Sequence, residues 1–535
     1  MKTISKKCKT ALMLTAIAVL SVTMLPSCDY SYIDELDNIQ DYNYSPVLAF
    51  PLANASISLD DLIDVGDFGG IEVDEEDLVT LVYMGQIFSV PASDIFSVKD
   101  QSQVFTYDNI VPAGSGSMTL PPKVFLITFD NNEVLTYISF LEGMFRVSAH
   151  ASQLAQDGYN LEANFRILNS YDSQELPING TVSLNNPGET DLTGSRIEFD
   201  NQANFFLLEY QLFITGDGSP DNAPYTIEFR QEMTGLRFDL IKGYIDQINF
   251  PAGNTSVTLS LFKNATLGSL VFENPSIEFT MDNSFGAEID LFVQEFYATT
   301  IEEKNIPVTG PAIEEPWRVY ASETHENPVL TTFRLLDNSN TNLFDITEQS
   351  PKKVYYEVTG LTNPDADQQP TNWIKHDSHL SIEMEVNLPL WGRINIFELQ
   401  DTAEISVDGF LDEMEWVELK MNFSNGFPLN VVLDLILLDK NNNAIDTLFT
   451  RQDNLLDAAS VNPATSIAEE PRISSRIERL DDTKIENLRK ATNLLIEARL
   501  NSYDHQNGTT VKILDTYRIG IDLGIRGQVK YAVEF

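Results

Sequence analysis

Cysteine is nearly absent from this 535-residue chain, which contains two. Cys8 lies in a leader that we expect to be removed, and the other is Cys28. With one cysteine left, the mature chain cannot form an internal disulfide, so its stability has to come from buried apolar area. A catalytic cysteine is also excluded, because we assign Cys28 to lipid attachment below.

Positive charge is scarce as well. The chain has 34 Lys and Arg residues against 80 Asp and Glu, a formal net charge of −46. Removal of the leader takes away four lysines and no acid, which leaves a net charge of −50. A field of that sign repels nucleic acid and anionic membrane surfaces, so we expect no nucleic-acid partner. Cations, basic proteins and neutral glycans remain compatible with it.

Familiar catalytic motifs are missing. The sequence has no G-x-S-x-G nucleophile elbow, no H-E-x-x-H metal motif, no Walker loop and no Rossmann glycine fingerprint. We therefore expect a non-catalytic protein without a metal or a cofactor. A carboxylate pair for glycoside hydrolysis is neither excluded nor identified, because any two of the 80 acids could supply it.

The N-terminus has the layout of a secretory signal. Its first nine residues contain four lysines and no acid, and an apolar run of 16 residues, 10–25, follows. That run is shorter than the ~20 residues that a membrane-spanning helix needs. Residues 1–27 are therefore predicted to be a cleaved signal peptide.

Leu25-Pro26-Ser27-Cys28 at the end of the run resembles a lipobox, in which a leucine at −3 and a small residue at −1 precede a lipid-modified cysteine. Pro26 departs from the usual small residue at −2. The resemblance implies that Cys28 is acylated, and several acyl chains hold a protein to a bilayer durably. The alternative is an ordinary signal peptide followed by a buried or disulfide-bonded cysteine.

An acidic segment, 28–45, follows the anchor and is predicted to be a solvated tether. Acids close behind the lipidated cysteine are similar to the surface-export signal of Bacteroidota lipoproteins, although here they are scattered. We expect a protein anchored in the outer membrane by lipid, on either the cell surface or the periplasmic face.

Period-two alternation of Val, Ile, Phe, Tyr and Thr with polar residues dominates the rest of the chain. It predicts a mainly β protein of tandem antiparallel β-sandwich domains with few short helices. Helix is expected at 59–65 and after a capping box at 483–486. Breaks in the pattern predict a β domain over 46–155, β-sandwich domains over 156–305 and 306–470, and a C-terminal β module with a short helix over 471–535.

The C-terminal module differs in charge from the rest. It contains 11 basic and 9 acidic residues, a net charge of +2. We favour a terminal module that packs on an acidic body, and a docking face for an acidic partner is the alternative.

An internal repeat is also predicted. Three segments share a strand, an Asn, a small residue, an aromatic residue and a turn into another strand. They are Asn169-Ser170-Tyr171, Asn283-Ser284-Phe285 and Asn425-Gly426-Phe427. Asn tolerates a left-handed backbone and caps its own turn, and the aromatic ring can plug the end of a sandwich.

The second of these segments follows Phe272-Glu273-Asn274-Pro275-Ser276, and this arrangement resembles the LEA type 2 β-sandwich family over fragments of about 30 residues. More broadly, the chain resembles large envelope lipoproteins of Bacteroidota. Segments 45–63, 388–405 and 491–524 carry that resemblance. It implies the location and the sandwich fold, and no activity.

One small group of residues is a candidate ligand site. His376 and His379 lie three residues apart with a carboxylate between them, beside a polar loop at 361–372. Imidazoles at that spacing can bind a metal, but no third ligand is identifiable, so we favour a structural role. Trp373, next to the same loop, is the best candidate for an exposed aromatic that stacks on a sugar.

The leading hypothesis is a non-catalytic outer-membrane lipoprotein that acts as a binding or scaffold subunit of a cell-envelope complex. Its expected partners are the membrane, through Cys28, and other envelope proteins. The alternative is a surface glycan-binding lipoprotein.

Overall fold

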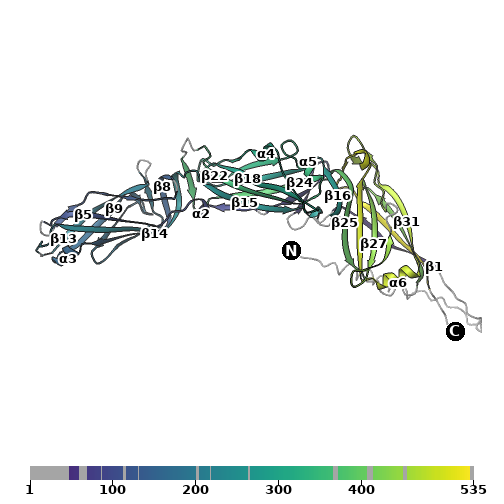
Figure 1. The fold of residues 1–535 in the computed structure, drawn as a ribbon, viewed down its shortest axis with the longest axis horizontal. Helices are drawn as coiled ribbons and strands as arrows, with labels where there is room; N and C mark the ends of the chain where they lie inside the picture. Colours follow the sequence, from purple (N-terminus) through teal and green to yellow (C-terminus); the bar gives the residue numbers. More distant parts are fainter. Residues whose placement is uncertain are drawn as a thin grey trace, which may run out of the picture.

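A computed structural model describes residues 47–59, 69–85, 87–112, 116–130, 132–199, 204–216, 219–262, 265–365, 371–405, 414–449 and 455–529. Within these ranges the chain is mainly antiparallel β with short helices, as predicted. The strands form three units in a row (Figure 1), here named distal, middle and proximal. The proximal unit contains the first and last described strands, which pair with each other. The predicted signal peptide, tether and lipidation site Cys28 lie outside the described residues.

The distal unit is one sheet that encloses an aromatic core. Its strands alternate buried and exposed side chains, and rings from facing strands stack inside, with Tyr210 and Phe229 4.3 Å apart between centroids. The elements are β5 (Gln101–Ile110), β6 (Gly116–Thr119), β7 (Lys123–Leu126), β8 (Val134–His150), α3 (Ser152–Gln156), β9 (Asn160–Tyr171), β10 (Pro177–Ser183), β11 (Gly188–Asp191), β12 (Arg196–Glu198), β13 (Phe205–Thr215) and β14 (Tyr225–Tyr244).

The middle unit is a sandwich of two sheets. The first sheet has the order β2-β3-β24-β17-β21, with β4 beside β24, and the second has the order β15-β22-β18-β19, with β20 beside β18. Its strands are β2 (Gly69–Val73), β3 (Val79–Met84), β4 (Phe88–Pro91), β15 (Asn249–Thr258), β17 (Ser276–Asn283), β18 (Ile289–Thr300), β19 (Asn305–Pro307), β20 (Trp317–Val319), β21 (Leu330–Leu336), β22 (Pro351–Thr362) and β24 (His379–Pro389). Short helices are α2 (Ala92–Ile95), η2 (Ser260–Phe262), α4 (Pro311–Glu314) and α5 (Leu343–Thr347).

The proximal unit is a second sandwich, with sheet orders β1-β34-β26-β31 and β16-β25-β32-β27-β28. Its strands are β1 (Val47–Ile57), β16 (Ala265–Phe272), β25 (Trp391–Glu404), β26 (Met414–Asn425), β27 (Leu429–Leu438), β28 (Ala444–Phe449), β29 (Val461–Asn462), β30 (Ile467–Ala468), β31 (Arg472–Leu480), β32 (Asn493–Ser502), β33 (Val511–Lys512) and β34 (Ile519–Val529), with α6 (Asp482–Lys490) and η4 (His505–Asn507). The predicted helix after 480 is present as α6. Its N-cap is Asp481, whose carboxylate accepts a hydrogen bond from the Lys484 backbone N–H, so the cap lies two residues before the predicted box.

The chain path is nested. It runs from β1 in the proximal unit through β2–β4 in the middle unit to β5–β14 in the distal unit, and then returns. On the return it passes through β15 in the middle unit, β16 in the proximal unit and β17–β22 in the middle unit. It then adds the strand Asn372–Lys375 to the distal sheet, forms β24 in the middle unit and enters the proximal unit again at β25. Because strands pair with partners far away in sequence, the predicted consecutive ranges 46–155, 156–305, 306–470 and 471–535 do not coincide with these units. The described part of the predicted C-terminal module, residues 471–529, pairs with β1, β25, β26 and β27 and is an integral part of the proximal unit.

Two of the three predicted repeat segments adopt the same turn. Asn283 and Asn425 are buried at the ends of β17 and β26, where the chain crosses to the facing sheet. Each Asn side chain accepts a hydrogen bond from the N–H two residues on and donates to the carbonyl oxygen four residues on. The following aromatic residues, Phe285 and Phe427, are buried as predicted plugs. Asn169 differs, because it lies inside β9 with a φ of 53°.

Candidate functional site

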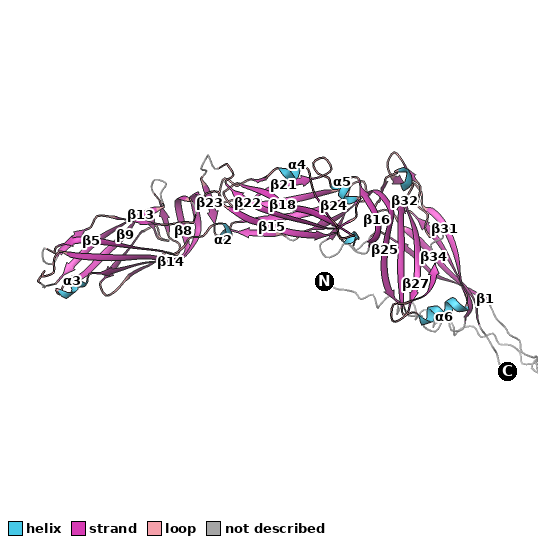
Figure 2. Cartoon of the chain, in the orientation of Figure 1, coloured by secondary structure: helices cyan, strands magenta, loops and turns pink. Residues whose placement is uncertain are grey.

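The predicted ligand residues lie at the joint between the distal and middle units. Strand β23 (Asn372–Lys375) pairs with the last residues of β14 in the distal sheet. After a short turn the chain enters β24 of the middle unit at His379. The segment 372–379 therefore spans both units, as Figure 2 shows at β23.

Trp373 is a packing residue. Its side chain is 6% exposed, and its indole N–H donates a hydrogen bond to the Ser322 carbonyl oxygen at 3.2 Å. The ring lies against Gly286, where an added Cβ would come within 2.3 Å of the indole. The expectation of an exposed, sugar-stacking Trp373 is wrong, because the turn after β17 covers the ring.

The two histidines do not converge. The His376 imidazole faces Asp239 on β14, with Nδ1 3.4 Å from the carboxylate oxygen. The His379 Nδ1 instead lies 3.2 Å from the Asp377 carbonyl oxygen and 3.4 Å from the Ser284 hydroxyl. Among the described residues there is no group of three or more His, Cys, Asp or Glu side chains that could hold a metal ion. The histidines contribute instead to the contacts of the joint.

A buried amide pair joins the two units. The Asn363 and Asn372 side chains exchange hydrogen bonds of 2.9 Å in both directions. The Asn372 oxygen also accepts from the Ile245 N–H at the end of β14, and its amide donates to the Gly286 carbonyl oxygen. Asn363 in turn donates to the Asp246 carbonyl oxygen. Sequence reasoning missed this pair, because the two Asn residues looked like ordinary members of a polar loop.

An ion cluster on β20 lies beside the amide pair. The Arg318 guanidinium donates to Asp290 at 2.5 Å and to Glu288 and Asp365 at 2.8 Å each. Asp290 is 9% exposed, and Arg318 holds the pKa of Asp365 below its ordinary value. The Asn363 N–H donates to the Glu288 carbonyl oxygen, so the cluster is connected to the amide pair through the backbone.

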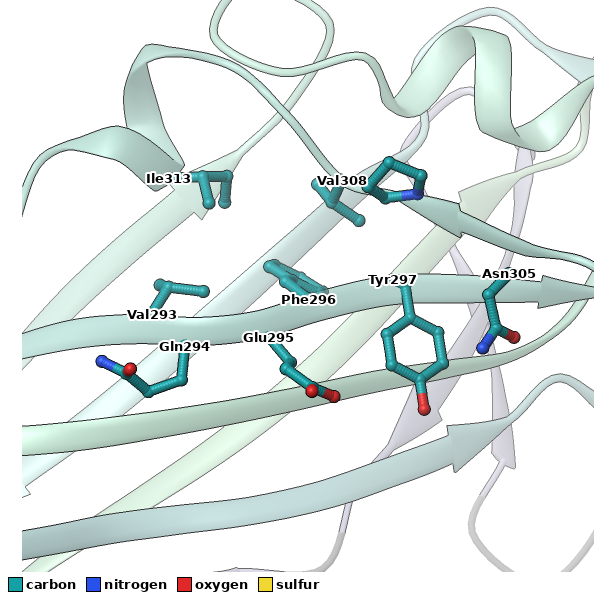
Figure 3. A pocket seen from close by; sticks show the side chains of 9 residues that line it. Val293, Gln294, Glu295, Phe296, Tyr297, Asn305, Val308 and Ile313 are labelled. Carbon is teal, nitrogen blue, oxygen red and sulfur yellow. The ribbon is translucent and has the colours of Figure 1, made fainter.

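Three shallow hollows lie on the part of the surface that the structure describes, and the sequence indicated none of these three. The first, of about 410 Å³, lies on the middle unit over the edge of β18 between β19 and α4. Figure 3 shows Phe296, Val308 and Ile313 at its apolar side, with Glu295 and Tyr297 on the other side of the strand. The pairing of β18 with β22, on the other side of β18, has a bulge between Val293 and Glu295, two of the residues that line the hollow.

The second hollow, of about 560 Å³, lies in the distal unit beside α3. His150, Ser152, Gln153, Asn185, Thr226 and Glu228 supply its polar lining. Nearby, Asp157 fixes the loop before β14, because its carboxylate accepts hydrogen bonds from the Tyr225 hydroxyl at 2.7 Å and the Asn222 N–H at 2.8 Å. These bonds lower the pKa of Asp157.

The third hollow, of about 530 Å³, lies on the outer face of the proximal sheet. Its lining includes Pro51, Asn54, Lys420, Asn422 and Asp522, and Gly524 supplies no side chain to fill it. Each of the three hollows is lined by one carboxylate, namely Glu295, Glu228 or Asp522.

No family model and no curated protein matches the chain. Among solved structures, a Parabacteroides distasonis protein provisionally classed as secreted is similar over 90% of this chain and 99% of its own, with 9% identity and a TM-score of 0.29. The PBSX exported protein XepA aligns over 59% of this chain and 98% of its own, with 9% identity and a TM-score of 0.13. TM-scores this low do not establish a shared fold.

None of the described helices is both long enough and apolar enough to span a bilayer.

Proposed function

We propose that this protein is a non-catalytic outer-membrane lipoprotein that acts as a rigid binding or scaffold subunit of a cell-envelope complex. The observation that carries the proposal is the elongated row of three β units (Figure 1). Strand pairing between β14 and β23 and the buried Asn363–Asn372 pair lock the distal unit to the middle one. A stiff rod of this kind suits a protein that holds a partner at a set distance from its anchor.

The anchored end is the proximal one. Cys28 precedes β1 by the acidic segment 28–45, which at ~3.5 Å per extended residue would reach about 60 Å. In this arrangement the distal unit and its polar hollow are presented away from the membrane. Most buried apolar residues belong to one connected cluster that runs through all three units, and a small second cluster around Val417 and Leu480 lies in the proximal unit. The continuous cluster supports a rod that moves as a whole.

A non-catalytic role agrees with the hollows. Glycoside hydrolysis needs two carboxylates on opposite sides of a bound sugar, and each hollow has one. The alternative, glycan binding, was based on an exposed Trp373 that stacks on a sugar. Trp373 is buried under the turn at Gly286, so its ring is not available for such stacking.

The anchor is tested with labelled palmitate in cells that express the natural chain or Cys28→Ser. We expect label in the natural protein and a shift of the Cys28→Ser variant to the soluble fraction. Unlabelled natural protein, or identical fractionation of the two, contradicts lipid anchoring. Protease shaving of intact cells then distinguishes the surface from the periplasmic face.

The scaffold role is tested by crosslinking intact cells and purifying the protein. We expect an envelope protein in stoichiometric amount, lost when the distal hollow carries His150→Ala with Asn185→Ala. The matched control, Lys420→Ala with Asn422→Ala, changes the proximal hollow and should retain the partner. Recovery of the protein alone after crosslinking contradicts a scaffold role.

A further inference from the structure

Strand β31 forms an edge of the proximal unit. It is the last strand in the order β1-β34-β26-β31, and Figure 1 shows it on the side away from the middle unit. An edge strand presents backbone N–H and C=O groups that can pair with another strand. Among the described strands, β26 is the one that pairs with β31.

The outward face of β31 carries two unusually exposed isoleucines. Ile473 is 69% exposed and Ile477 is 62% exposed, although both belong to a regular strand. Ser475 lies between them on the same face and is exposed as well. Protected edges normally place charges outward, so two outward isoleucines at an edge indicate a surface that is covered by a partner.

The sequence of β31, Arg-Ile-Ser-Ser-Arg-Ile-Glu-Arg-Leu, is complementary to itself in the antiparallel direction. With Ser475 opposite Ser475 of a second copy, Ile473 faces Ile477 on the outer side of the sheet. On the other side Arg472 faces Glu478. Because of the two-fold axis, each of these pairs occurs twice in the dimer. Cross-strand pairs of apolar residues and of opposite charges both stabilise a sheet.

We propose that the protein forms a two-fold homodimer in which β31 of each copy pairs antiparallel about Ser475. The two four-stranded proximal sheets then join into one continuous sheet across the dimer. If the pair were centred on Arg476 instead, Ile473 would face Arg479 and Ile477 would face Ser475. The register centred on Ser475 is the one in which Ile473 of each copy faces Ile477 of the other. This inference does not depend on lipid anchoring or on an envelope partner.

Cysteine trapping tests the register directly. In the full mature chain with Cys28→Ser, a new cysteine is the sole one, because Cys8 is removed with the signal peptide. Ser475→Cys places two sulfurs on the two-fold axis, where opposite Cα atoms are about 4.5–5.5 Å apart and a disulfide fits. We expect a disulfide-linked dimer after mild oxidation.

The matched control is Arg479→Cys on the same face of the same strand. In the proposed register the two copies of this residue are eight positions apart, about 27 Å, and should not crosslink. Equal crosslinking of the two variants, or none with Ser475→Cys, overturns the proposal.

Sedimentation equilibrium of the mature Cys28→Ser chain provides an independent measurement. We expect the natural chain to sediment with twice the mass of one chain. Ile477→Lys places a charge opposite Ile473 of the second copy, so the dissociation constant should rise about tenfold or more, which corresponds to about 1.4 kcal/mol. Ile87→Lys is the control, because Ile87 is 63% exposed in the middle unit. A monomeric natural chain, or equal effects of the two substitutions, contradicts the dimer.

Discussion

Asn363 and Asn372 exchange two hydrogen bonds between their side-chain amides while both are almost completely buried. Asn363 follows β22 of the middle unit, and Asn372 begins the strand that pairs with the distal sheet. A buried amide has to be satisfied on both its oxygen and its nitrogen, so each residue fixes the position of the other. The pair therefore sets the joint between the two units.

We expect Asn372→Ala to destabilise the joint by about 2 to 4 kcal/mol, because it leaves the Asn363 amide and the Ile245 N–H buried without this acceptor. Urea unfolding followed by tryptophan fluorescence measures the loss, since Trp373 neighbours the substituted residue. Asn441→Ala, at an exposed hairpin tip, serves as the control and should leave the transition unchanged. Equal stability of the Asn372→Ala variant and the natural protein would show that the pair does not hold the joint.

Gly286→Ala should destabilise the middle unit by about 1 to 3 kcal/mol. The added Cβ would lie 2.3 Å from the Trp373 ring, which is itself buried and has little room to move. Gly70→Ala on β2 is the matched control, because its Cβ would meet nothing within 4 Å. Thermal unfolding should show a lower midpoint for the first variant and an unchanged or slightly higher midpoint for the second. Identical midpoints would mean that Trp373 is not packed as described.

Arg318→Met should cost about 2 kcal/mol, because it leaves the nearly buried carboxylate of Asp290 without its cation. The estimate is below that for a fully buried pair, since Arg318 is partly exposed. Arg237→Met removes the exposed Arg237–Glu142 pair instead, and we expect a change of less than about 0.5 kcal/mol. Denaturant unfolding of both variants in low and high salt checks the difference, and equal losses would argue against a special role of Arg318.

Acid should weaken the distal unit partly through Asp157. Hydrogen bonds from the Tyr225 hydroxyl and then the Asn222 N–H lower the pKa of Asp157 from its ordinary value of 3.8. A carboxyl group whose pKa is lower in the folded state stabilises the fold above the unfolded pKa, and this contribution is lost as pH falls through the folded pKa.

The test compares the natural protein with Asp157→Asn by thermal unfolding at about pH 7 and about pH 2.5, one above and one below the ordinary pKa of an Asp carboxyl group. The natural protein should be the more stable at pH 7, and the difference should shrink at the lower pH. Asp100→Asn, at an exposed position, controls for the loss of one negative charge. A difference between the natural protein and Asp157→Asn that is independent of pH would contradict the role of the Asp157 hydrogen bonds.

Local patterns in the sequence predicted local structure well. The alternation of apolar and polar residues predicted the strands, and a local turn at 439–443 joins β27 to β28. There the Asp439 carboxylate accepts the N–H groups of Asn441 and Asn443, which is a contact between near neighbours. The same holds for the turns at Asn283 and Asn425, since their bonds reach residues two and four positions on.

The residue pattern alone was enough to predict a chain of strands with few helices, because the alternation of apolar and polar side chains involves neighbours within a few positions. The pattern could not predict which strands share a sheet, and so it missed the nested path, the burial of Trp373 and the separation of His376 from His379. These depend on pairing between residues that are often a hundred or more positions apart, such as β1 with β34. Alternation shows that a strand has a buried face, but the partner that covers that face is fixed when the whole chain packs.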